Sequence, residues 1–347
     1  MEEETKQLKI PELASFRCLS LLFILFLLSF CTSPLSQKKP PRERGILFNT
    51  YSLKTIHIHP IQKFFFNFFN LPDDEEISRN TFYISVNLSE LAKENSQGSF
   101  TTRLLVDTGS SDNLYKKFFL KKSEVGFSSP VRTANQNFEQ KFEVHRLFVY
   151  TDDHSNNLGL HTFLATDMLD FLPVEGILGN QFFSKYIVWF NFETEMRLFL
   201  PNEWMKFPVD DMDEISANTQ VKTHWLLPVI IQGKIYQFLF DTGADYTIFS
   251  ENLAQNFSYL PNKSLSYIEF SGKIYNSKIY ISPEICLSAR NCSTNVLGLS
   301  SSSLNNFFPN SQIQVDGILG MNWIKDYVCF LHYPKKKIFI KKKIFNK

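Results

Sequence analysis

The sequence lacks several patterns that mark common functional classes. It contains no Cys-x-x-Cys and no His-Glu-x-x-His, so two familiar redox and metal-binding signatures are excluded. Its 13 glycines form no glycine-rich loop that opens a helix, which argues against a phosphate-cradling nucleotide site. The formal net charge is +1, so the charge balance indicates no nucleic-acid partner.

Long apolar runs are also scarce. The N-terminal run Leu19–Phe30 has about twelve residues, whereas a membrane-spanning helix needs about 20. Basic residues precede this run and Cys31 follows it, an arrangement that suits an export signal and resembles a bacterial lipoprotein lipobox. Phe30 departs from that pattern, in which a small residue precedes the cysteine. We expect residues 1–31 to be a signal or lipoprotein-type anchor that tethers an exported protein to the cell envelope through Cys31; a plain anchor helix is the alternative.

Few cysteines and histidines remain for other chemistry. Cys286 and Cys292 bracket "LSARN" and can close a small disulfide in an oxidising compartment. Cys329, in "YVCFLHY", is typical of a buried strand. The "HIH" at His57 and His59 favours an N-terminal loop or strand over a metal site. We therefore expect no metal and no organic cofactor.

Helical periodicity is likewise rare. From about Thr81 onward, short alternating and β-branched runs such as "TFYISVNL" and "YIVWFNF" predict a largely β protein. Residues 32–75 are basic and proline-containing at first and Phe-rich later, and we expect them to form a linker or a pro-like segment. The acidic residues 207–221 lie between strand-like runs and are expected to link two domains.

Two motifs occur twice, in the same order. "LLVDTGSSDNLY" and "FLFDTGADYTIF" place Asp107 and Asp241 after apolar strands, 241 − 107 = 134 residues apart. The Gly-Ile-Leu-Gly runs that begin at Gly176 and Gly317 lie 317 − 176 = 141 residues apart. Each run is followed by an aromatic-rich strand, a polar turn and a last strand. A fixed order at nearly one offset indicates an internal duplication.

This duplicated device resembles that of the aspartic peptidases, the pepsin-like and retropepsin-like enzymes. In that family each lobe supplies an Asp-Thr/Ser-Gly loop and, later, a hydrophobic-hydrophobic-Gly motif that packs beneath it. The resemblance covers roughly residues 80–345. It implies an all-β fold of two homologous acid-protease-type β-barrel lobes, 76–206 and 222–347, with the active site between them. Because the lobes are small, a fused retropepsin-like dimer is the better comparison, and a monomeric chain is expected.

The resemblance also implies the catalytic residues, Asp107 and Asp241. Two carboxylates a few ångströms apart cannot both ionise, so the pair shares one proton. The charged member can activate water while the protonated member polarises the scissile carbonyl. The supporting loop residues would be Thr108, Gly109, Ser110, Thr242, Gly243 and Ala244. The glycines allow a tight turn, and the family implies that the two threonines cross-bond the loops.

The loops differ at one position, which holds Ser110 in the first copy and Ala244 in the second. In the family a hydroxyl at this position can bond the neighbouring carboxylate and stabilise its charged form. We therefore predict that Asp107 has the lower pKa and that Asp241 more often holds the shared proton.

Three further acids lie near the motifs. Glu175 and Asp316 precede the Gly-Ile-Leu-Gly runs and are expected to be turn or supporting residues. Asp112 is expected to be solvated. Hairpins around "TANQNFEQKFEVHRL" and "YIEFSGKIYNSK" are predicted to close over a peptide. The C-terminal "YPKKKIFIKKKIFNK" predicts a solvated edge strand, with attraction to an anionic membrane as the alternative.

The sequence therefore predicts an aspartic endopeptidase that acts on a peptide or protein substrate, with membrane contact through its N-terminal segment. The alternative is a catalytically inactive aspartic-protease-like module that binds a peptide or a protein. Retention of both aspartates, both threonines and both glycines favours the enzyme, because a binding module has no need of paired acids.

Overall fold

The computed structural model describes residues 54–60, 81–89, 99–117, 126–132, 137–154, 156–170, 172–192, 195–201, 209–218, 220–221, 224–268, 274–302, 304, 307–308 and 313–343. These residues are mostly in strands, so the predicted all-β class is confirmed. The α-helices in these ranges are single turns: α2 (Asn180–Phe183), α3 (Glu251–Ala254) and α4 (Met321–Ile324). None of the described helices is long and apolar enough to cross a membrane. The predicted signal with Cys31 lies outside the described residues.

Within the first half, residues 82–199, the strands from Phe82 to Leu178 form a sheet that closes on itself where β2 also pairs with β6. The order is β2 (Phe82–Ser89), β3 (Phe100–Val106), β8 (Gly176–Leu178), β4 (Leu114–Lys116), β7 (Asn157–Thr166), β6 (Asn137–Thr151) and β5 (Gly126–Arg132). The even-numbered apolar residues of β2 are buried, which is the period-two pattern that the sequence shows. This face contributes to the core.

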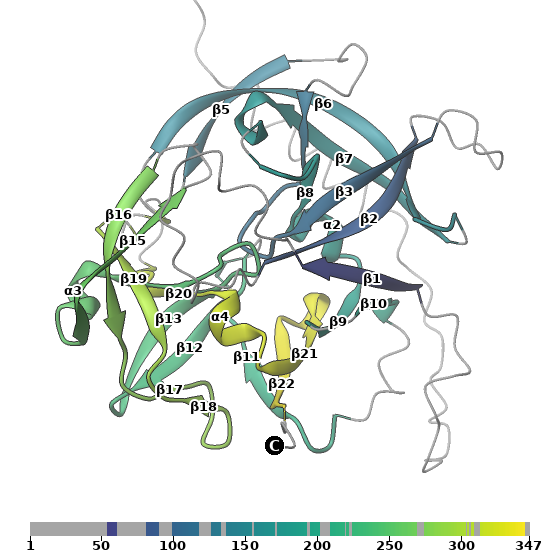
Figure 1. Cartoon of the computed structure of the whole chain (residues 1–347). Helices are drawn as coiled ribbons and strands as arrows, with labels where there is room; N and C mark the ends of the chain where they lie inside the picture. The colour runs from purple at the N-terminus through teal and green to yellow at the C-terminus, as the bar shows by residue number, and fades with distance from the viewer. Residues whose placement is uncertain are drawn as a thin grey trace, which may run out of the picture. The chain divides into compact units, whose positions relative to one another are not determined.

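The second half, residues 226–342, repeats the same order of pairings, and most of its strands are labelled in Figure 1. Its order is β12 (Leu226–Ile231), β13 (Lys234–Phe240), β20 (Gly317–Leu319), β14 (Thr247–Ser250), β19 (Leu297–Ser301), β16 (Ile274–Ile281) and β15 (Ser258–Ile268). In both halves the strand before the Asp-Thr-Gly loop pairs in parallel with the short Gly-Ile-Leu strand. The duplication read from the sequence is thus present in the topology, although the two motifs differ in spacing.

A further set of antiparallel strands joins residues from both halves. At its centre β9 (Ile187–Asn191) pairs with β21 (Tyr327–His332), and Phe190 lies opposite Cys329. On one side follow β10 (Glu195–Phe199) and β1 (Lys54–Pro60); on the other follow β22 (Lys337–Lys342) and β11 (Asp213–Ser216). Cys329 is buried here, as predicted. Buried apolar side chains from both halves form one continuous cluster.

These outer strands show pairing inside two of the expected connecting segments and correct the expectation for the C-terminal strand. Strand β1 lies inside residues 32–75, the expected linker or pro-like segment, and pairs with both β10 and β2. It includes "HIH", which is therefore in a strand. Strand β11 lies inside the acidic segment 207–221 and pairs with β22. The lysine-rich β22 is thus not an edge strand, and its Lys337 forms an ion pair with Glu214 of the strand that covers it.

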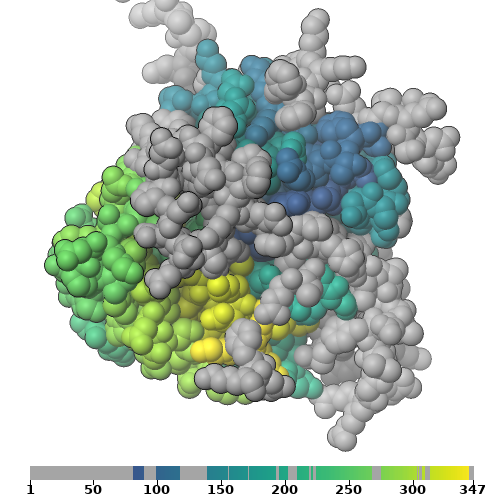
Figure 2. Space-filling model, in the orientation of Figure 1, coloured from purple at the N-terminus to yellow at the C-terminus, as the bar shows by residue number. Residues whose placement is uncertain are grey.

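A small hairpin, β17 (Ile285–Cys286) and β18 (Cys292–Ser293), extends the second-half sheet beyond β12. A disulfide joins Cys286 to Cys292, the pairing that the sequence allowed. Between them the amide Nδ2 of Asn291 donates to Asp213 of β11 (2.7 Å), and its Oδ1 accepts from the Lys342 backbone N–H (3.0 Å). In Figure 2 the yellow C-terminal strands border the yellow-green surface of this region. The hairpin therefore holds the two outermost strands, β11 and β22, against the second-half sheet.

Removing this disulfide should lower stability without abolishing the fold. Cross-linking a loop with a sequence separation of 6 restricts the unfolded chain modestly, so the Cys286→Ser/Cys292→Ser variant should lose about 2 kcal/mol of unfolding free energy. Denaturant titration measures this loss. A reductant should lower the midpoint of the wild type and leave that of the double variant unchanged; equal sensitivity of both would contradict the prediction.

Candidate active site

The two Asp-Thr-Gly loops leave equivalent strands and are held in equivalent ways. Asp107 follows β3 and Asp241 follows β13. The backbone N–H of each aspartate donates to the carbonyl of the leucine in the Gly-Ile-Leu strand, Leu178 or Leu319, at 3.0 Å in both halves. The hydrophobic-Gly motifs therefore position the loops through the backbone, as the resemblance implied.

The structure brings the two aspartates together. Their carboxyl groups hydrogen-bond to each other. Each aspartate also accepts a hydrogen bond at 2.8 Å from the backbone N–H of the glycine two residues later in the chain, Gly109 for Asp107 and Gly243 for Asp241. Burial raises the pKa of both carboxyls, and the charge of Asp241 adds to the rise at Asp107, whose pKa lies well above its ordinary value. The pair therefore retains a proton at a pH where isolated carboxyls would both be charged.

Each glycine of the motif lies against the carboxyl group of the other half. A Cβ at Gly109 would lie 2.3 Å from Cγ of Asp241, and one at Gly243 would lie 2.4 Å from Cγ of Asp107. These separations are far shorter than a carbon–carbon contact allows. The sequence suggested that glycine is needed for a tight turn. The structure adds a second reason: the carboxyl of the opposite half leaves no room for a side chain at either glycine.

Thr108 and Thr242 connect the loops by four reciprocal hydrogen bonds. The backbone N–H of each threonine donates to the hydroxyl of the other, at 3.1 Å and 3.0 Å. Each hydroxyl in turn donates to a carbonyl of the opposite strand end, Phe240 for Thr108 and Val106 for Thr242, both at 2.8 Å. Both threonines are fully buried. This is the cross-bonding that the family resemblance implied for them.

Ser110 does not make the contact expected of its hydroxyl. Its Oγ donates to the backbone carbonyl of Asp112 (2.9 Å), while its backbone N–H donates to Oδ1 of Asp107 (3.0 Å). The predicted stabilisation of Asp107 by this hydroxyl is therefore wrong, because the loop turns the hydroxyl toward its own backbone. The Asp112 carboxylate accepts from the Ser111 hydroxyl (2.6 Å), and Ala244 packs on a small apolar cluster.

Two supporting residues were not found by sequence reasoning. The Nδ2 of Asn180 donates to the carbonyls of Thr108 (2.7 Å) and Ser110 (3.0 Å). The hydroxyl of Tyr333 donates to Oδ1 of Asn180 (2.7 Å). Asn180 directly follows the Gly-Ile-Leu-Gly run, but the second copy has Met321 there, so a search for repeated residues passes over it. Asn180, fixed by Tyr333, therefore holds the backbone of the first Asp-Thr-Gly loop in place.

Loss of the Tyr333 hydroxyl should be costly because it leaves a buried oxygen of Asn180 without its donor. We expect Tyr333→Phe to lower the unfolding free energy by about 1 to 3 kcal/mol. Denaturant titration of Tyr333→Phe, Asn180→Ala and the double variant measures the coupling of the two side chains. The double variant should be less destabilised than the sum of the two single variants. Strict additivity would contradict the contact.

Glu175 and Asp316 fill the supporting role expected of them. Glu175 accepts the backbone N–H of Arg103 in β3, and Asp316 accepts that of Gln237 in β13, both at 2.8 Å. The two carboxylates thus occupy equivalent positions and hold the strands that lead into the loops. They contact the sheet, not the paired aspartates.

The predicted hairpins are present as the antiparallel pairs β5–β6 and β15–β16. Their turns, residues 133–136 and 269–273, lie outside the described residues. Near the end of the second hairpin the rings of Tyr267 and Tyr275 stack with centroids 5.8 Å apart. Closure of either hairpin over a peptide stays a prediction.

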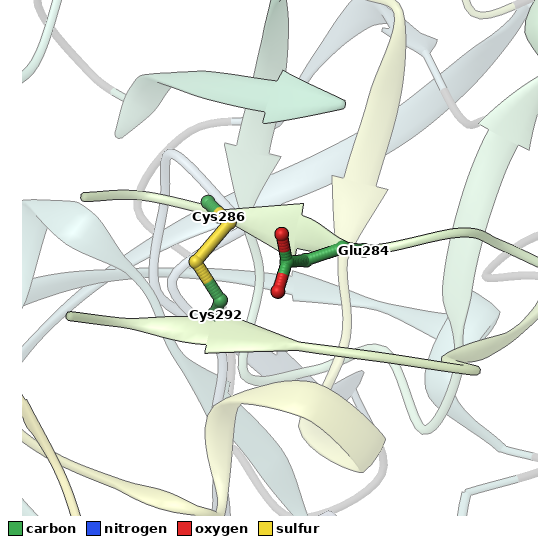
Figure 3. A group of neighbouring side chains, drawn as sticks. All are labelled: Glu284, Cys286 and Cys292. Carbon is green, nitrogen blue, oxygen red and sulfur yellow. A yellow bond between two sulfur atoms is a disulfide. The ribbon is translucent and has the colours of Figure 1, made fainter. Parts of the chain in front are cut away.

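Among the described residues, one group has the spacing of metal ligands: Glu284, Cys286 and Cys292. Figure 3 shows the carboxylate of Glu284 beside the bond that joins the two sulfur atoms. Because these sulfurs are bonded to each other, they are not thiolate ligands. A single carboxylate is a poor basis for a metal site, and we assign none here.

The chain matches no protein-family model and no curated protein. Its function therefore has to be inferred from the geometry of the paired aspartates.

Proposed function

We propose that this protein is an aspartic endopeptidase, with its two halves as acid-protease-type β-barrel lobes and its active site between them. One observation carries the proposal: Asp107 and Asp241, from equivalent loops, share a hydrogen bond between half-buried carboxyls. The reciprocal bonds of Thr108 and Thr242 support the same reading, because they keep the loops in register. A stability role alone gives no reason to bury two acids together, since their mutual repulsion and desolvation cost free energy.

In the proposed reaction, one carboxyl is charged and the other is protonated. The charged carboxylate takes a proton from water as the water oxygen attacks the scissile carbonyl carbon, while the protonated carboxyl hydrogen-bonds to the carbonyl oxygen. Collapse of the tetrahedral intermediate breaks the carbon–nitrogen bond, and the amine leaves with a proton from the carboxyl pair. The products are a carboxylic acid and an amine, and the pair again holds one proton.

The setting proposed for this activity is the cell envelope, with the chain as a monomer that supplies both aspartates. The Cys286–Cys292 disulfide supports an oxidising compartment. An extended peptide is the substrate class that a cleft between two β-sheet halves suits, since peptides bind such sites as added strands.

Cleavage of a peptide mixture by the full chain tests the proposal. Wild-type protein should cleave internal peptide bonds at some value between about pH 3 and pH 7, and pepstatin, a general inhibitor of this family, should block the cleavage. The Asp107→Asn/Asp241→Asn variant, purified in parallel, identifies any contaminating protease. Folded wild-type protein that neither cleaves peptides nor gains thermal stability from pepstatin would overturn the proposal and favour a noncatalytic binding module.

A further inference from the structure

Just before the first strand of each half, β2 or β12, lies a residue whose type differs between the halves. In the second half Leu226 pairs with Leu239, and in the first half Tyr83 pairs with Leu105 in the same way. His224 precedes Leu226 by two residues and Thr81 precedes Tyr83 by two residues. The two therefore hold equivalent positions.

Each of these residues crosses to the catalytic loop of the opposite half. Thr81 donates its backbone N–H to Oδ1 of Asp245, just beyond the second Asp-Thr-Gly (3.0 Å). His224 reaches the first loop, where its imidazole hydrogen-bonds to the backbone of Gly109. Both halves thus make this contact with the opposite loop, but Thr81 makes it through its backbone and His224 through a titratable side chain.

The direction of the His224 contact follows from its chemistry. The hydrogen bond to Gly109 favours the protonated ring, which a carbonyl acceptor does and an N–H donor does not. The imidazole therefore donates to the Gly109 carbonyl. That carbonyl belongs to the same peptide group as the N–H of Ser110, which donates to Oδ1 of Asp107 at 3.0 Å. A hydrogen-bonded path leads from the imidazole through one peptide group to the carboxyl.

Packing holds the ring in place. The rings of Phe307 and Phe308 lie edge-on to it, with centroids 5.9 Å and 5.5 Å away. Lys336, in the turn before β22, donates from Nζ to the carbonyl of His224 (3.2 Å). Burial and, second, the Lys336 charge lower the pKa of His224 to about 4.

The charged groups around His224 therefore come from two sides. Lys336 lies on the side of the C-terminal strands, and the two aspartates lie beyond the Gly109–Ser110 peptide. The segment at Phe307 and Phe308 presents aromatic rings. Because the pKa of His224 is about 4, the ring is a neutral donor above that pH.

We propose that His224 is a positioning residue for Asp107: its imidazole fixes the Gly109–Ser110 peptide, and this peptide orients the carboxyl and favours its charged form. This inference rests on the proposed function. A donor at the carbonyl end of a peptide polarises its N–H and strengthens the bond that the N–H donates. The histidine thus opposes part of the effect of burial on Asp107.

The test reads the carboxyl groups directly, by ¹³C NMR titration of the full chain labelled at aspartate. Removing the donor with His224→Thr should raise the apparent pKa of the aspartate pair by about half a unit. His224→Asn and His224→Gln place an amide donor where Nδ1 or Nε2 lies, and one of them should restore the wild-type value. Thr81→Val, at the equivalent position, should cause no shift, because Thr81 bonds through its backbone.

Activity gives a second readout. The acidic limb of kcat/KM should move upward with the carboxyl pKa in His224→Thr and return in the amide variant that restores the donor. A drop in kcat with no movement of either titration would assign His224 a merely structural role and overturn the inference. Cleavage by the wild type with unchanged titrations in every variant would leave the endopeptidase intact and remove the role of His224.

Reciprocal coupling keeps the test decisive if His224→Thr does not fold. In Asp107→Asn the carboxyl at the end of the path is replaced by an amide, so the ring ¹⁵N signals of neutral His224, read by NMR near neutral pH, should shift. Unchanged ring signals of His224 in folded Asp107→Asn would contradict the path. This measurement does not depend on cleavage, so it separates failure of the inference from failure of the proposed function.

Discussion

Asparagine in place of either Asp107 or Asp241 is expected to lower kcat by roughly 10³-fold, and the double variant is expected to lower it little further. In the proposed reaction each carboxyl needs the other, because one takes a proton from water while the other holds the proton that polarises the carbonyl. Removing one member therefore removes the function of both. Steady-state cleavage of a peptide identified in the mixture measures these effects.

Asp112→Asn is the matched control for these variants. Asp112 lies in the same loop as Asp107, but its carboxylate bonds to the Ser111 hydroxyl. Its replacement should leave kcat nearly unchanged. If the loss in Asp112→Asn equals that in Asp107→Asn, the assignment of the catalytic pair is wrong.

Stability against pH gives an independent view of the same pair. Burial raises the pKa of both carboxyls in the folded protein, so the folded state binds more protons than the unfolded state above the ordinary carboxyl range. The pair's contribution to unfolding free energy is therefore greatest at low pH and falls as pH rises toward the raised pKa values. Asp107→Asn and Asp241→Asn should flatten that part of the profile, as denaturant titrations at several pH values would show.

Much of this site could be predicted from the sequence because the chain carries it twice. Asp-Thr-Gly and Gly-Ile-Leu-Gly each recur after apolar strands, and a repeat of that kind predicts equivalent loops that meet. The alternating residues of β2 and the aromatic runs of β9 and β21 predicted strands for the same local reason. The all-β class follows from these patterns without any tertiary information.

The missed features depend on single residues or on contacts between distant segments. Asn180 and His224 have no counterpart of the same type in the other half, where Met321 and Thr81 stand. Their roles become visible only when the backbone places Tyr333 or the Gly109 carbonyl beside them. Strand β11 was hidden for another reason: its acidic residues match a linker in composition, and only pairing with the lysine-rich β22 makes it a strand.

The second large effect is expected from a single methyl group. Gly109→Ala would place its Cβ 2.3 Å from Cγ of Asp241, and Gly243→Ala would place its Cβ 2.4 Å from Cγ of Asp107. A carboxyl would have to retreat by about 1 Å to restore normal contact, and a displacement of that size costs about 10²-fold or more in rate. We expect both variants to lose at least this much kcat.

Gly233→Ala separates this steric effect from a general cost of losing glycine. Gly233 has φ +76 and open space where a Cβ would lie, so alanine there strains the backbone but touches no other group. Its variant should lose some stability and keep its kcat, whereas Gly109→Ala and Gly243→Ala should lose activity beyond any change in the folded fraction. Thermal unfolding with steady-state kinetics on all three variants measures both quantities. Full activity in folded Gly109→Ala would mean that the carboxyl of Asp241 does not lie against Gly109 in the reactive state, because the added Cβ and that carboxyl cannot occupy the same space. The proposed arrangement of the two carboxyls would then be wrong.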